Sequence, residues 1–310
     1  MTYVALSPVK RPVLLETAER RWTAISAARP DLEPAVALQR RLLGAMIDLD
    51  GVFAGGRVPR LSLPPKYLAA KLTRGVPIFS GEPIPLPAGV IKPTLLRLCD
   101  ALADGGAGDA AIHIREAIES GNIEVGSLLT ASLKRDQTAI RTGATHRGLS
   151  PDLVWLVAEL AVSPFTHTLQ RLLLQSDAAP LVDALAAWNK GYCPACGSWP
   201  ALAEVVGGHR TLRCSFCSSA WELSTYACIY CAEAGEPFVT AAPDEQRKDR
   251  RLEVCGTCGG YLKTIDLSEL SPFPLLAISD IETTDLDVAA MEHGYMRPAL
   301  KDVSGRSAEG

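Results

Sequence analysis

The sequence predicts an α+β multidomain protein. An all-α N-terminal domain is followed by two tandem four-cysteine modules of the zinc-ribbon type and by a short C-terminal helical tail. Apolar residues recur at helical spacing through residues 1–190, and eight of the nine cysteines then occur in four Cys-x-x-Cys pairs. Short strand-like segments separate these pairs. We expect domains at 1–188, 189–267 and 268–310, with the two modules at about 189–225 and 226–267.

Apolar periodicity and breaker residues predict about seven or eight helices in the first domain. Eight prolines from Pro59 to Pro93 predict an ordered, extended connection after the second helix, with a short helix at 66–71. We expect Pro93 in the first turn of its helix and a break or kink at Pro164. The expected helices are 13–28, 32–49, 93–102, 109–120, 127–141, 151–162, 165–174 and 180–189.

The cysteine-rich stretch and the tail predict short elements. Strands are expected at 201–206, 211–213, 220–223, 238–240, 251–254 and 261–265. In the tail we expect a strand-like run at 275–278, a short helix at 286–293 that packs back on the body, and a loose end at 297–310. The acidic run of Asp280, Glu282, Asp285 and Asp287 predicts a solvated helix start, where negative charge is favourable.

The spacing of the cysteine pairs predicts two metal sites. Two thiols separated by two residues can bind one ion, and two such pairs complete a tetrahedral four-thiolate site with metal–sulfur bonds of about 2.3 Å. Sequential pairing is expected, although interleaved pairing stays open on the sequence alone. The expected ligands are Cys193, Cys196, Cys214 and Cys217 in site 1, and Cys228, Cys231, Cys255 and Cys258 in site 2.

The two modules have the pattern of a doubled unit. Gly197 and Gly259 follow one pair in each module and permit a left-handed backbone, whereas Ser218 and Ala232 follow the other two pairs. An aromatic residue also follows the second pair of each module, Trp221 in the first and Tyr261 in the second.

Other uses of the cysteines fit the pattern less well. Disulfides need an oxidising compartment, and a thioredoxin-like site needs one pair at the end of a βα unit. Iron–sulfur clusters also use four cysteines, but paired cysteines favour a single ion. Cys99 stands alone on the apolar face of a helix, so we expect a buried structural thiol there.

Composition and motifs argue against several functions. The net charge is −4, and residues 190–263 contain eight basic and eight acidic residues, so nucleic acid is not an expected partner. No apolar run approaches the ~20 residues that span a bilayer, and the N-terminus has no signal-peptide pattern, so we expect a cytoplasmic protein without stable membrane insertion. No catalytic or cofactor-loop motif occurs, so we expect no enzyme activity, no catalytic residues and no cofactor-binding residues besides the metal ligands.

The cysteine motifs also resemble those of a known family. The sequences Gly191-Tyr192-Cys193-Pro194-Ala195-Cys196-Gly197-Ser198, Cys214-Ser215-Phe216-Cys217, Cys228-Ile229-Tyr230-Cys231 and Cys255-Gly256-Thr257-Cys258-Gly259-Gly260-Tyr261-Leu262-Lys263 resemble the FdhE family of formate dehydrogenase accessory proteins. Leu286-Asp287 and Gly294-Tyr295-Met296-Arg297 extend the resemblance into the tail, so that it covers nearly the whole chain.

The resemblance implies a cytoplasmic maturation factor that binds the catalytic subunit of respiratory formate dehydrogenase before twin-arginine export. It also implies rubredoxin-like sites, with two mononuclear iron ions held by four thiolates each; zinc is possible instead, because both metals accept this geometry. The alternatives are a zinc-ribbon adaptor for protein interactions and a rubredoxin-like one-electron carrier. We expect Trp199, Phe216 and Tyr230 on the client-binding surface, with packing between the modules as the alternative.

Overall fold

The structure, a computed structural model, describes residues 3–59, 61, 63–242 and 247–298. Its residues fall into two compact units, each of which is described by itself. The helical unit comprises Val9–Ser62 and Gly81–Gln170. The sheet unit comprises the described residues of Met1–Pro8, Leu63–Ser80 and Arg171–Gly310. The expected domain boundaries at 188/189 and 267/268 stay a prediction about parts that fold independently, and residues 299–310 of the expected tail lie outside the described residues.

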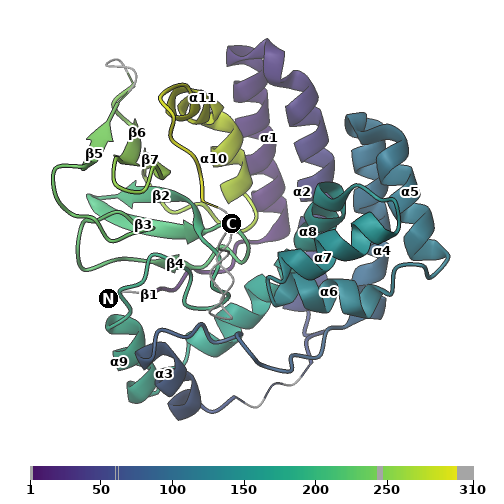
Figure 1. The fold of residues 1–310 in the computed structure, drawn as a ribbon, viewed down its shortest axis with the longest axis horizontal. Helices are drawn as coiled ribbons and strands as arrows, with labels where there is room; N and C mark the ends of the chain where they lie inside the picture. The colour runs from purple at the N-terminus through teal and green to yellow at the C-terminus, as the bar shows by residue number, and fades with distance from the viewer. Residues whose placement is uncertain (1–2, 60, 62, 243–246, 299–310) are drawn as a thin grey trace. The chain divides into compact units, whose positions relative to one another are not determined.

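The helical unit is built from α-helices with apolar faces (Figure 1). Neighbouring pairs in contact include α1 with α2, α2 with α4, α4 with α5, and α6 with α7. The rings of Phe53 and Phe165, 5.4 Å apart, meet edge to face in its core. The helices are α1 (Arg11–Ala28), α2 (Glu33–Ala54), α4 (Ala88–Leu102), α5 (Gly108–Glu119), α6 (Val125–Leu133), α7 (Gln137–His146) and α8 (Pro151–Leu174), with 3₁₀ turn η1 (Pro30–Leu32) and π turn η2 (Ala103–Ala107) between them.

Three helix predictions need correction. Helix α4 begins at Ala88, so Pro93 lies inside it and not in its first turn. The single helix expected over 127–141 is two helices, because Arg135 adopts a φ of 58° and the side chain of Asp136 caps α7. Helix α8 runs through Pro164 as one element, so the expected break is wrong, while the alternative of a kink stays a prediction. Buried apolar residues on both sides of the proline offset the lost hydrogen bond.

The sheet unit contains one sheet of seven strands among the described residues. Its order is β1-β4-β3-β2-β7-β6-β5, and every neighbouring pair is antiparallel except β2 with β7 (Figure 1). The strands are β1 (Tyr3–Val4), β2 (Pro200–Val206), β3 (His209–Cys214), β4 (Ala220–Trp221), β5 (Phe238–Ala241), β6 (Arg250–Cys255) and β7 (Tyr261–Leu267). The six strands expected between residues 201 and 265 are all present; β1 has no counterpart in the sequence predictions.

This strand order makes the two modules a direct repeat within one sheet. In each module a Cys-x-x-Cys turn precedes a hairpin, and the second strand of the hairpin runs into a second Cys-x-x-Cys turn and a third strand. The first module occupies the sheet as β4-β3-β2 and the second as β7-β6-β5, in the same sense. The parallel pairing of β2 with β7 joins them, so the modules share a sheet and are not two separate ribbons.

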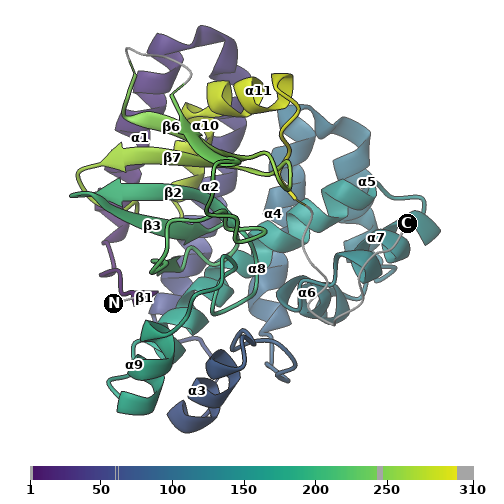
Figure 2. The same cartoon turned by 60° about the vertical axis from the view of Figure 1, so that its left-hand side comes forward.

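Helices from the tail cover one face of this sheet (Figure 2). Helix α10 (Leu276–Glu282) packs Leu276 on Leu202 and Ile265, and α11 (Thr284–Glu292) packs Leu286 and Ala290 on β6 and β7. The strand-like run expected at 275–278 is therefore wrong, since these residues enter α10. The expected short helix at 286–293 corresponds to α11. Two further helices of this unit, α3 (Pro65–Thr73) and α9 (Ala179–Ala186), contact each other.

Candidate metal centres

The four Cys-x-x-Cys turns share one backbone geometry. In each turn the N–H of the first cysteine donates to the carbonyl oxygen five residues later, at 2.8–3.0 Å. The N–H four residues later donates back to the carbonyl of that cysteine, at 2.9–3.2 Å. The donor residue of this second bond has a positive φ in every turn: Gly197 80°, Ser218 54°, Ala232 65° and Gly259 67°. The left-handed backbone predicted for the two glycines therefore also occurs at Ser218 and Ala232, where the Cβ makes this conformation strained.

Backbone N–H groups in these turns point at sulfur. The N–H of Ala195 lies 3.4 Å from Cys193 Sγ, and the N–H groups of Phe216 and Cys217 lie 3.4 and 3.5 Å from Cys214 Sγ. Donors directed at sulfur stabilise the thiolate, which is the form that binds a metal.

The first four-cysteine group consists of Cys193, Cys196, Cys214 and Cys217, and all four side chains are buried. The Sγ atoms of Cys193 and Cys217 are 3.6 Å apart, those of Cys196 and Cys214 are 3.4 Å apart, and those of Cys196 and Cys217 are 3.8 Å apart. A tetrahedron with metal–sulfur bonds of about 2.3 Å has sulfur–sulfur edges of about 3.8 Å. The group therefore fits a single four-coordinate ion.

The second four-cysteine group consists of Cys228, Cys231, Cys255 and Cys258, whose sulfurs also lie within 4.8 Å of one another. The Cys228–Cys258 and Cys231–Cys255 Sγ separations are both 3.6 Å. Cys228 and Cys255 are buried, whereas Cys231 and Cys258 are exposed. The structure thus brings the cysteines together in sequential pairs, and the two groups differ in their access to solvent.

Burial disfavours the thiolate form of the cysteines in the first group, and a bound cation would offset this cost. Burial raises the pKa of the Cys193 and Cys214 thiols well above the usual range, because a thiolate loses its hydration there. Burial also acts on Cys255, but the N–H groups of Cys258 and Thr257 outweigh it and lower the pKa of that thiol to about 7. Cys99 belongs to neither group: it is buried on α4, and burial raises its pKa to about 12.

Aromatic side chains fill the space between the two modules. Trp199 meets Tyr230 at 5.0 Å between ring centroids and meets Tyr192 at 6.0 Å, both edge to face. Trp199 and Phe216 are 8% and 1% exposed, so the expectation that they form an outer contact surface is wrong for these two residues. A tryptophan gains more by burying its ring against other rings than by standing in solvent.

A charged cluster joins the tail to β7, next to the second group. The Lys263 side chain is fully buried, and its Nζ lies 2.7 Å from both Asp280 and Asp287. Arg297 also binds both carboxylates and lies over the Tyr261 ring, which donates its hydroxyl to Asp287. Asp285 pairs with Arg247 at 3.1 Å, so three members of the acidic run expected to be solvated are ion-paired. The following backbone also contacts the site, because the Met296 N–H donates to Gly259 at 2.9 Å.

Two further buried ion pairs were missed by sequence reasoning. Glu204 pairs with Arg213 where both side chains are fully buried, and Glu253 pairs with Arg210. Arg213 also donates to the Ser271 carbonyl at 2.7 Å. Alternation did not reveal them, because residues 202–204 and 211–214 are buried without a break; a charge buried in this way requires a partner.

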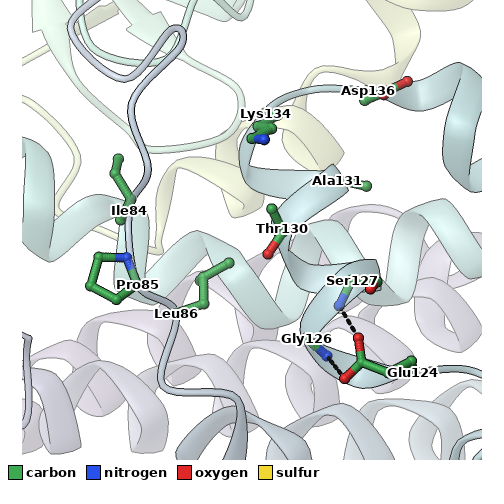
Figure 3. Close-up of a pocket in the computed structure, with 10 residues that line it drawn as sticks. All are labelled: Ile84, Pro85, Leu86, Glu124, Gly126, Ser127, Thr130, Ala131, Lys134 and Asp136. Atoms are coloured by element: carbon green, nitrogen blue, oxygen red, sulfur yellow. Dashed lines mark hydrogen bonds between the residues drawn. The ribbon is translucent and has the colours of Figure 1, made fainter.

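Two cavities, one in each unit, are further candidate sites. A cavity of about 510 Å³ in the helical unit lies between residues 84–86 and α6 (Figure 3). Its Glu124 carboxylate accepts the N–H groups of Gly126 and Ser127 and thereby caps α6. The Ser127 side chain, followed by these two N–H groups, lowers the pKa of the carboxyl. This carboxylate serves the helix end and is not directed at a ligand. A cavity of about 650 Å³ in the sheet unit is lined by Tyr192, Trp199 and the Cys228–Ala232 turn.

None of the helices within the described residues combines the length and the apolar character needed to span a lipid bilayer.

Comparisons with known proteins agree with the resemblance seen in the motifs. No family model matches the chain. Over 115–118 residues the chain is 29% identical to the FdhE homolog of Aquifex aeolicus and 33% identical to both FdhE of Escherichia coli O127:H6 and the FdhE homolog of Haemophilus influenzae. These matches span 36–37% of this chain and 37–40% of the relatives, which is well under two thirds of their length.

The fold comparison covers more of the chain. The crystal structure of the FdhE protein from Pseudomonas aeruginosa superposes with a TM-score of 0.59 at 22% identity, over 97% of this chain and 98% of that one. This likeness establishes the shared fold. The chain is thus similar in sequence to proteins named FdhE over about a third of its length, and similar in fold to one over nearly all of it.

Proposed function

We propose that the chain is an accessory protein for the maturation of respiratory formate dehydrogenase. In this proposal it binds the catalytic subunit of that enzyme in the cytoplasm before export. The resemblance of the cysteine motifs, the FdhE relatives and the FdhE-like fold support the proposal. The observation that carries it is the pair of four-cysteine groups on one sheet, because this is the feature on which the resemblance depends.

The same geometry supports a role without catalysis. A site with four thiolates on one ion has no open coordination position, so it does not activate water. Such an ion fixes the relative positions of two turns and their hairpins, and an iron ion in this environment can also carry one electron. We propose that all eight paired cysteines are ligands and that the sites shape a protein-binding surface.

Iron is the proposed resident metal, and zinc is the alternative. The donor set does not choose between them, since both accept tetrahedral thiolates. A visible spectrum of freshly purified protein decides: a ferric four-thiolate site absorbs in the visible range and bleaches on reduction, whereas a zinc site is colourless. A colourless, zinc-containing protein would favour the adaptor function over the electron carrier.

A deletion strain with intact formate dehydrogenase genes tests the function. We expect it to make the catalytic polypeptide but to lose membrane formate oxidation. The wild-type gene should restore activity, Cys228→Ser should not, and Cys99→Ala should serve as the matched cysteine control. Tagged protein should recover the catalytic polypeptide from cell extract. Normal formate oxidation in the deletion strain, without recovery of that polypeptide, would overturn the proposal.

A further inference from the structure

We propose that the two metal ions are not equivalent: the first four-cysteine group holds a permanent ion, and the second holds an ion that exchanges with thiols and chelators in solution through Cys231 and Cys258. This inference concerns how firmly the chain's own cysteines hold each metal ion. It does not depend on formate dehydrogenase as the client.

The first argument is the difference in burial at matched positions. Cys196 and Cys231 are the second cysteines of the first turns in the two modules; Cys196 is 6% exposed, whereas Cys231 is an exposed residue. Cys217 and Cys258 are the second cysteines of the second turns, and again only the residue of the second module is exposed. Two ligand residues of the second group are therefore exposed to solvent, whereas their counterparts in the first group are buried.

The second argument is the cover over the first group, which comes from distant parts of the chain within the sheet unit. The buried residues Ile78 and Phe79 donate their N–H groups to the carbonyls of Pro194 and Ala195, at 2.9 and 3.0 Å. Strand β1 pairs with β4, with Tyr3 opposite Trp221 and Val4 opposite Ala220, so it lies alongside the strand that follows the second turn of the first group.

At the second group the tail supplies one backbone hydrogen bond, from Met296 N–H to Gly259, and much of the two turns stays exposed. These turns present Ala232, Gly256 and Thr257 to solvent. Strand β5, the first strand of this module, forms the free edge of the described sheet, whereas its counterpart β2 lies in the interior.

The third argument is hydrogen bonding to sulfur. The hydroxyls of Ser198 and Ser219 lie 3.4 Å from the sulfurs of Cys196 and Cys217. Glu233 and Gly260 occupy the matched positions in the second module, so those two hydroxyls are not repeated. A hydroxyl that donates to a metal-bound thiolate stabilises it and slows its departure.

The proposed step is ligand exchange. An incoming thiol or chelator gives up its proton as its donor atom bonds the ion. Cys231 or Cys258 takes up a proton as its sulfur–metal bond breaks, and no electrons are transferred. The same step at the first group requires the covering segments to open first, which adds the free energy of local unfolding to its barrier.

The test uses the full chain loaded with Zn²⁺ and the chelator 4-(2-pyridylazo)resorcinol, whose zinc complex is followed by absorbance. Release should occur in two phases of one equivalent each, with rates that differ at least about tenfold because only one group needs local opening. Cys231→Ser should remove the fast phase, and the matched Cys196→Ser should remove the slow one. Release of both ions in a single phase would overturn the proposal.

Thiol mapping on the unmutated protein provides a second measurement, should a variant fail to fold. Limited iodoacetamide treatment of the zinc-loaded chain, followed by mass spectrometry, should modify Cys231 and Cys258 first. First modification at Cys196 or Cys217, or equal modification of both groups, would contradict the inference.

Discussion

Replacing Ala232 with glycine should tighten metal binding at the second group. Ala232 has a φ of 65°, a left-handed conformation that costs a residue with a Cβ about 1–2 kcal/mol. Glycine removes this strain but makes the unfolded chain more flexible, which costs about 0.4–1 kcal/mol. The net gain is about 0.5–1 kcal/mol.

The gain should appear in the metal affinity. Short strands and turns of this kind fold together with their ion, so strain in the folded turn weakens binding directly. A gain of about 0.5–1 kcal/mol corresponds to a roughly two- to fivefold lower dissociation constant. We would measure it by competition between the full chain and a chromophoric chelator, and compare the weaker-binding equivalent in wild type and variant.

Two matched variants isolate the cause. Gly259 stands at the equivalent position of the other turn, with a φ of 67° and no atom within 4 Å of an added Cβ, so Gly259→Ala should weaken the same ion by a similar factor through strain alone. Ala234 is exposed and has no positive φ, so Ala234→Gly reports the general effect of glycine, a slightly weaker site. If Ala232→Gly weakened the site as much as Ala234→Gly does, the strain argument would fail.

Four other predictions follow from the structure. Elemental analysis of Cys99→Ala should give about two metal equivalents per chain, as in wild type; a loss of metal would make Cys99 a ligand. Lys263→Met should destabilise the protein by about 1–3 kcal/mol in urea unfolding, because two partly buried carboxylates lose a cation, whereas Arg251→Ala at an exposed pair should cost under about 1 kcal/mol. Burial raises the pKa of Asp280, but Lys263 and Arg297 outweigh it, so the folded pKa lies below 3.8. This pairing therefore stabilises the fold at neutral pH and is lost as the pH falls below about 3.8, where unfolding curves of wild type and Lys263→Met should converge. Chelation should speed amide exchange throughout the sheet unit, including the 76–79 segment, and leave the helical unit protected; equal loss in both would contradict separate stabilisation.

Features set by local spacing could be predicted from the sequence. The four turns depend on residues within five positions of one another, so the cysteine spacing and Gly197 and Gly259 were sufficient to predict them. The short strands followed from their alternation and from the turns that bound them. The helices of the helical unit followed from periodicity, except where one residue decided the outcome, as Arg135 does between α6 and α7.

Features set by long-range packing could not be predicted in the same way. Strand β1 has only two residues, and its pairing with β4 spans more than 200 residues of chain. The run at 275–278 is too short to show a period, and helix α10 forms because Leu276 packs on Leu202 and Ile265. The partners of Glu204 and Lys263 also become visible only once the strands are placed.

The direct repeat itself explains why the two groups differ. Both modules lie in one sheet in the same sense, and the last strand of the second module, β7, pairs with the first strand of the first module, β2. The last strand of the first module, β4, is then left for another partner, and β1 takes this place beside the first group. The first strand of the second module, β5, has no neighbour on its outer side in the described sheet. Two modules with the same turns therefore acquire different surroundings from their order alone, and an enclosed site next to an open one is the expected result of this arrangement.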